Sequence, residues 1–256
     1  MMRNTRRVWA HIAATTLVAI AGCARVPGIP TAGADVARPD KQLDFHALYK
    51  QGCSGCHGDN GHGGAAIPLN NPAYLAFAGA DNIRSATAKG MNATMMPAFA
   101  ASSGGMLTDQ QVDALVQGML REWGRPSDFA GIALPPYAAT APGHPTDGQK
   151  AYAAACARCH GTDGIGIRPS ANSPTQTRES TSHSIVDTSY LELVSDQSLR
   201  GLIVAGHPDS STPDWRTYIA GRALTPQEIT DIVAWLGAHR ASPAQQSAAT
   251  SGKENR

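Results

Sequence analysis

One pentapeptide pattern, Cys-x-x-Cys-His, occurs twice in this chain of 256 residues. Its members are Cys53, Cys56 and His57 in the first copy and Cys156, Cys159 and His160 in the second. Two thiols at this spacing can each form a thioether bond to one vinyl group of a haem, and the adjacent imidazole can then bind the iron. Cys-x-x-Cys alone also serves zinc sites and redox disulfides, but neither of these needs the histidine. The repeated pattern therefore predicts two covalently bound haem c groups.

The fifth cysteine, Cys23, lies at the end of an N-terminal apolar run. A segment with three arginines precedes this run, which covers residues 8–21 and is too short to span a bilayer comfortably. Its last residues, Ile-Ala-Gly-Cys, resemble the lipobox of bacterial lipoproteins. The resemblance implies a signal peptide that is cleaved before Cys23, a lipid on the Cys23 sulfur, and a location on the periplasmic side of a bacterial membrane. A plain signal peptide with an incidental Cys23 is the alternative.

The net charge excludes one class of partner. The chain has 21 Lys and Arg residues against 20 Asp and Glu residues, and the basic residues form no dense patch. Nucleic acid is therefore not an expected partner, because binding to it needs a basic surface. The residues after the predicted cleavage site suffice for two domains of about 100 residues each.

The similarity between the two halves extends well beyond the pentapeptide. Residues 74–99 align without a gap at an offset of 116, whereas the pentapeptides are offset by 103. The second copy thus contains an insertion, and its Ser/Thr-rich part, residues 170–182, is typical of a solvated loop. Since the register holds over a whole copy, the halves are predicted to be tandem copies of one domain.

Helical patterns occupy corresponding places in both copies. Residues 43–51 and 147–157 lead into the two pentapeptides with apolar residues at helical spacing. Later helices are expected to begin at Thr108 and at Thr225, where Pro226 and Glu228 complete a capping-box pattern. No alternating pattern of useful length predicts a strand. The fold class is therefore all-α.

Composition divides the chain into six segments. The linker contains five prolines and is expected to be semi-rigid. The predicted segments are the signal peptide 1–22, a tether 23–40, the first domain 41–124, the linker 125–145, the second domain 146–240 and a disordered tail 241–256.

Each half resembles a class I c-type cytochrome domain, a small helical fold wrapped around a covalent haem. In that family the haem histidine follows the first helix, and a methionine that precedes a proline binds the other face of the iron. The segment Met95-Met96-Pro97 matches this pattern, so the resemblance implies Met96 as the sixth ligand of the first haem. Pro68 resembles the family proline whose carbonyl accepts a hydrogen bond from the ring of the haem histidine, which would orient His57.

The second copy departs from the family pattern at the sixth ligand. Thr212 stands where Met96 stands in the first copy, and all seven methionines precede the second domain. The second haem therefore has no methionine from its own domain. Three interpretations stay open: His207 binds the iron, His183 or another group binds it, or the sixth position is vacant or holds water.

These patterns predict single-electron transfer, with no catalytic residue assigned. The resemblance implies a lipid-anchored dihaem cytochrome that links redox proteins of a respiratory chain, such as a quinol-oxidising complex and a terminal oxidase. An alternative is a haem enzyme, a peroxidase or a sulfur-anion oxidoreductase, that uses an open second haem with the first as its electron relay. A third possibility is a fixed subunit of a larger oxidoreductase.

Overall fold

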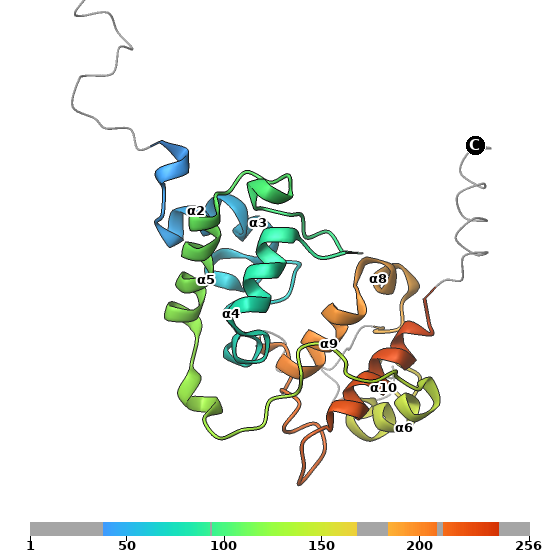
Figure 1. The fold of residues 1–256 in the computed structure, drawn as a ribbon. Helices are drawn as coiled ribbons and strands as arrows, with labels where there is room; N and C mark the ends of the chain where they lie inside the picture. The colour runs from blue at the N-terminus through green and yellow to red at the C-terminus, as the bar shows by residue number, and fades with distance from the viewer. Residues whose placement is uncertain (1–37, 93, 168–183, 209–211, 241–256) are drawn as a thin grey trace, which may run out of the picture. The chain divides into compact units, whose positions relative to one another are not determined.

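The computed structural model describes residues 38–92, 94–167, 184–208 and 212–240. Helices are the only regular elements within these ranges, apart from isolated β-bridges (Figure 1). The prediction of an all-α fold is confirmed. The signal peptide, the start of the tether, the insertion 170–182, His183 and the tail lie outside the described residues. The predicted segment boundaries stay predictions.

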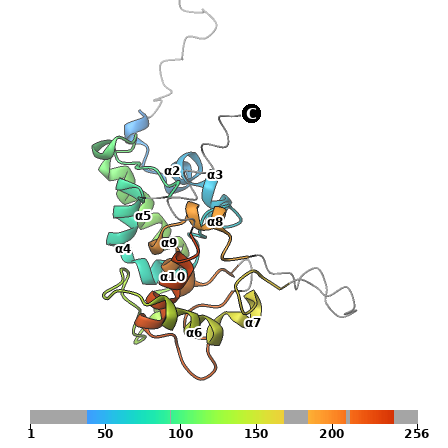
Figure 2. The same cartoon turned by 90° about the vertical axis from the view of Figure 1, so that its right-hand side faces the viewer.

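The helices follow one another in the same order in both copies (Figures 1 and 2). The first copy contains α2 (Phe45–Gly52), α3 (Ser54–His57), α4 (Pro72–Lys89) and α5 (Asp109–Trp123). The second contains α6 (Pro145–Ala155), α7 (Ala157–His160), α8 (Thr188–Leu193), α9 (Asp196–Ala205) and α10 (Pro226–Gly237). The described residues also form four 3₁₀ helices: η2 (Pro39–Lys41), η3 (Asp59–Gly61), η4 (Ala101–Ser103) and η5 (Pro126–Phe129).

Helix α4 corresponds to the pair α8 and α9. Inside α4 the chain changes direction at Gly79, whose φ of 67° suits glycine far better than other residues. The aligned residue of the second copy is Ser195, which caps the N-terminus of α9 with its side chain. The same bend is therefore made by a glycine in one copy and by two separate helices in the other.

Both predicted helix starts are confirmed. Thr108 and Thr225 each form a complete capping box, with Gln111 and Glu228 respectively as the residue that reaches back. The helices α5 and α10 then bury corresponding apolar faces. These faces comprise Val112, Leu115, Val116 and Met119 in α5, and Ile229, Ile232, Val233 and Leu236 in α10.

The first and last helices of each copy pack on one another, α2 on α5 and α6 on α10. The copies also pack on each other, because α4 contacts α9. One cluster of buried apolar side chains consequently runs through both copies, and the described residues between Gln42 and Arg240 belong to one compact unit. No helix of the described ranges has the length and apolar character needed to cross a bilayer.

Arg200 of α9 holds part of the predicted linker in place. Its side chain is only 2% exposed, and its guanidinium donates to the Pro136 carbonyl at 2.9 and 3.0 Å and to the Thr230 hydroxyl at 3.0 Å. The next linker residue, Tyr137, lies with its ring 5.4 Å from that of Phe77 in α4. This part of the linker is thus attached to both copies.

Candidate haem-binding sites

The first pentapeptide lies at the end of α2 and in the short helix α3. The His57 side chain is 6% exposed, and its Nδ1 lies 2.8 Å from the Ile67 carbonyl oxygen. With Nδ1 donating this bond, Nε2 carries the lone pair that a metal needs. Burial lowers the pKa of His57, which favours the same neutral form. His57 therefore has the ring orientation and the neutral form that an iron ligand needs.

The carbonyl that orients His57 belongs to Ile67, so the prediction of Pro68 is wrong by one residue. The N–H groups of Leu69 and Asn70 both donate to the Gly61 carbonyl, at 2.8 and 3.2 Å. These bonds fix the turn after Pro68, and they leave the Ile67 carbonyl as the one that faces the imidazole. The role expected from the family resemblance is present, but the peptide group before the proline performs it.

The two cysteines of this motif differ in exposure. Cys53 is buried and Cys56 is exposed, and both are free thiols. Burial raises the pKa of Cys53 to about 11, so the thiol is protonated and uncharged at neutral pH. Two thiols within one turn of an imidazole with an available Nε2 form the donor set that covalent haem requires. The residues of the first site fit haem c.

The second pentapeptide repeats one hydrogen bond of the first. A tyrosine one turn before the first cysteine donates its hydroxyl to the carbonyl of the glycine after the histidine in each copy. The distance is 3.0 Å from Tyr49 to Gly58 and 2.6 Å from Tyr152 to Gly161. Both tyrosines are buried. The shared contact holds α7 on α6 as it holds α3 on α2.

In the second motif Cys156 is half-buried and Cys159 is exposed. Desolvation and, to a smaller extent, the nearby Cys159 raise the pKa of Cys156 to about 12. The second motif thus combines a half-buried, uncharged thiol with a more exposed thiol. Two thiols within one turn of the imidazole of His160 are the donor set that covalent haem requires, so the residues of the second site also fit haem c.

The loop that carries Met96 begins where α4 ends at Gly90. This glycine has a φ of 72°, and a Cβ atom there would lie 2.8 Å from the Met96 carbonyl oxygen. The Met91 N–H donates to the same oxygen at 3.1 Å. Met96 is half-buried, whereas Met95 is 82% exposed. Met96 is therefore the better placed of the two for a core ligand, and its ligation stays a prediction.

The corresponding loop of the second copy begins and ends at residues that are joined in a similar way. His207 and Thr212 exchange two N–H to carbonyl hydrogen bonds, at 3.0 and 3.1 Å, in the positions aligned with Met91 and Met96. Gly206 has a φ of 68°, like Gly90. Thr212 therefore occupies the backbone position of Met96, which supports the alignment. The role of His207 stays a prediction.

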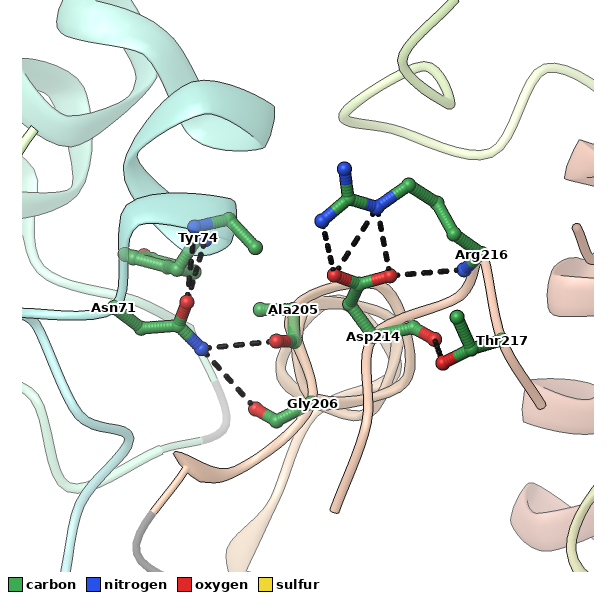
Figure 3. Close-up of polar contacts among 8 residues, drawn as sticks. Asn71, Tyr74, Ala205, Gly206, Asp214, Arg216 and Thr217 are labelled. Atoms are coloured by element: carbon green, nitrogen blue, oxygen red, sulfur yellow. Dashed lines mark hydrogen bonds and ion pairs between the residues drawn. The ribbon is translucent and has the colours of Figure 1, made fainter. Parts of the chain in front are cut away.

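Two residues near these sites were not predicted to be important. Asn71 hydrogen-bonds to both copies, as Figure 3 shows, and Arg200 anchors the linker. The sequence signal for Asn71 is a Pro at the next position, which indicates an N-cap. No local pattern indicates its second contact, with residues more than 130 positions away.

The comparisons with known proteins agree with this geometry. Residues 145–239 match the family model described as cytochrome c, and residues 41–117 match the model described as cytochrome c oxidase, cbb3-type, subunit III. The chain thus contains two cytochrome c domains in tandem and belongs to the class I c-type cytochromes. Such domains bind haem c covalently and transfer electrons.

Two further comparisons concern curated proteins and solved structures. A search with the whole sequence finds no match among curated proteins. Among solved structures, a chain of the reducing HAO-like protein complex of Kuenenia stuttgartiensis is similar, with a TM-score of 0.44 and 17% sequence identity. The similarity covers 77% of the present chain and 96% of that chain. At this level it carries no argument about function.

Proposed function

We propose that this protein is a dihaem c-type cytochrome that carries single electrons between redox proteins of a respiratory chain. The observation that carries the proposal is the geometry of the two Cys-x-x-Cys-His motifs. Each motif holds a less exposed and a more exposed thiol beside a histidine, and the same tyrosine contact fixes both motifs. A haem bound there supplies an iron that changes oxidation state by one electron.

The residues of the chain bind and orient this group. Two cysteines would attach each haem, and His57 and His160 would each provide a nitrogen ligand to one iron. The Ile67 carbonyl holds the His57 ring in one orientation. Met96 would add a thioether ligand to the first iron, and such a ligand favours a relatively high reduction potential. A closed, His/Met-ligated haem in an apolar core suits electron transfer because little has to move.

We further propose a lipid anchor on Cys23 and a periplasmic location. The support is the basic, apolar and lipobox-like order of the N-terminal residues. Arg200 attaches Pro136 of the linker to the second copy, so the linker is not expected to let the two copies swing apart. The protein would then reach its partners as one unit that contains both haems.

One observation favours a haem enzyme as the second candidate. Thr212 has the backbone position of Met96, and a threonine hydroxyl is a poor ligand for haem iron. If His207 does not bind the iron either, the second haem is open to a small ligand such as peroxide or a sulfur anion. The first haem would then serve as its electron relay.

The decisive experiment counts haems and probes the second iron. A pyridine haemochrome assay on the purified full chain should give two haems per chain, and the C156A/C159A variant should give one. Exposure of the reduced protein to carbon monoxide then separates the two functions. An unchanged spectrum supports the carrier, whereas binding to half of the haem supports the enzyme. One haem in the unmodified protein would contradict both functions.

The anchor is tested with the matched variant C23S. We expect this variant to retain two haems and to leave the membrane fraction, because only the lipid attachment is removed. A C23S protein that stays with the membrane would contradict the proposed anchor, while the haem count would be unaffected.

A further inference from the structure

One side chain of the first copy binds backbone groups of both copies. The Asn71 Oδ1 atom accepts hydrogen bonds from the N–H groups of Ala73 at 2.9 Å and Tyr74 at 3.4 Å, which caps α4. Its Nδ2 group donates to the carbonyl oxygens of Ala205 at 2.9 Å and Gly206 at 3.4 Å (Figure 3). Asn71 is 3% exposed, so these bonds are shielded from water. The two ends of one amide thus join two helices of different copies.

The two acceptor carbonyls lie at a particular place in the second copy. Ala205 is the last residue of α9 and Gly206 is its C-cap, where carbonyl groups lack intrahelical partners. The next residue, His207, begins the loop that returns at Thr212. Asn71 therefore holds the start of the loop that returns at Thr212. In this loop the second copy has Thr212 where the first copy has the predicted ligand Met96.

The aligned residue of the second copy shows that capping alone does not need an amide. Asp187 caps α8 by accepting a hydrogen bond from the Tyr190 N–H at 3.0 Å. A carboxylate accepts hydrogen bonds but cannot donate one when ionised. The amide at position 71 is thus required for the contact with α9 and not for the cap.

The loop is also held from within its own copy. The Trp215 N–H donates to the Val204 carbonyl at 3.2 Å, and the Trp215 side chain is 2% exposed. The returning end of the loop is therefore attached to the core of the second copy. The starting end, at Gly206, is the end that the first copy holds through Asn71.

We propose that Asn71 is a positioning residue for the second haem. By holding the Ala205 and Gly206 carbonyls, it sets the direction in which His207 leaves α9, and so it controls the sixth coordination position and the reduction potential of the second iron. The first copy thereby tunes the haem of the other copy. The inference rests on the proposed function only in that the second motif must carry a haem.

The test compares two substitutions at this position in the haem-loaded full chain. Both N71D and N71S keep a good N-cap residue for α4. N71D places a carboxylate against two carbonyl oxygens, whereas N71S removes the donor without adding a charge. We expect a changed EPR signal and a shifted midpoint potential for the second haem in both variants. The shift should be larger in N71D, and the signal of the first haem should stay as in the unmodified protein.

The control is T108A, which removes the cap of α5 in the same copy. Thr108 bonds with Gln111 of its own copy, so T108A should lower stability and leave the second haem unchanged. The inference is overturned if folded N71D or N71S retains the signal and potential of the unmodified second haem, or if T108A shifts them equally. If N71D does not fold, the inference is tested by comparing the second haem of N71S with that of the unmodified protein. A single haem in the unmodified protein would instead refute the proposed function, before any variant is compared.

Discussion

Phe45 of α2 fills the space that a side chain at Gly118 of α5 would need. A Cβ atom at Gly118 would lie 2.2 Å from the Phe45 ring. In the second copy the roles are exchanged, because Phe45 aligns with Gly148 of α6 and Gly118 aligns with Trp235 of α10. A Cβ atom at Gly148 would lie 2.8 Å from the Trp235 Cβ atom. Each helix crossing therefore combines one large aromatic residue with one glycine, in opposite order.

This packing predicts that neither glycine tolerates a methyl group. We expect G118A and G148A to lower the free energy of unfolding by about 1–3 kcal/mol, as overpacking of a filled core does. G148A should be the more harmful, because its Cβ atom would also lie 1.9 Å from the backbone oxygen of Asp231, which cannot rotate away. Urea unfolding of the haem-loaded protein measures both.

The matched control is G201A in α9. A Cβ atom there would be in ordinary contact, 3.7 Å from Ile67 and Tyr74, and alanine favours a helix over glycine. G201A should be neutral or slightly stabilising. Equal stability of G148A and G201A would show that the α6–α10 crossing is not tightly packed.

The aligned pair Arg84 and Arg200 predicts unequal effects of the same substitution. Arg200 is buried and donates to the Pro136 carbonyl and to Thr230, whereas Arg84 is exposed and bonds to Asp113. R200Q should lower the free energy of unfolding by about 1–3 kcal/mol, since buried acceptors lose their donor. It should also open the linker to limited proteolysis. R84Q should leave both properties nearly unchanged, and similar cleavage of the two variants would refute the linker contact.

Glu228 predicts an acid-dependent contribution to stability. The Arg222 guanidinium hydrogen-bonds to this carboxylate, at 2.6 and 2.7 Å, and the pKa of Glu228 falls to about 2, with Thr225 also lowering it. An unfolded glutamate has a pKa of about 4.3. Because the folded pKa is the lower one, the ionised carboxylate stabilises the fold at neutral pH, and this contribution is lost as the pH falls from about 4.3 to about 2.

The substitution E228Q should therefore reduce stability at pH 7 and flatten the stability profile over that acid range. The first copy already has a glutamine at the corresponding position, Gln111, which forms the same capping box without a titrating group. Denaturant midpoints measured from pH 7 to pH 3 test this prediction. An unchanged slope in E228Q would show that other carboxyl groups dominate the acid response.

Substitutions of the adjacent residues Met95 and Met96 should affect the first haem differently. Met96 is half-buried in the loop after α4, whereas the Met95 side chain is 82% exposed. M96A should remove the thioether ligand, open the first iron to carbon monoxide and lower its reduction potential. M95A should change neither property. Carbon monoxide binding by M95A but not by M96A would reverse the assignment of the ligand.

The sequence by itself determined the features that depend on neighbouring residues. The two Cys-x-x-Cys-His motifs, the tandem repeat, the all-α fold and the capping boxes at Thr108 and Thr225 were predictable, because thioether spacing and helix caps involve residues within one or two turns. The position of Met96 in a loop after α4 also followed from the family pattern. These relations between residues close in sequence do not depend on how the two copies pack on each other.

Only the tertiary structure decided which side chains join the copies. Arg84 and Arg200 occupy equivalent positions in the repeat, yet one is exposed and the other lies beneath the linker. Asn71 is an N-cap residue like Asp187, but its amide also reaches carbonyls 134 and 135 residues away. Such contacts depend on how α4 packs against α9, and local periodicity does not record the packing of segments that are distant in the chain.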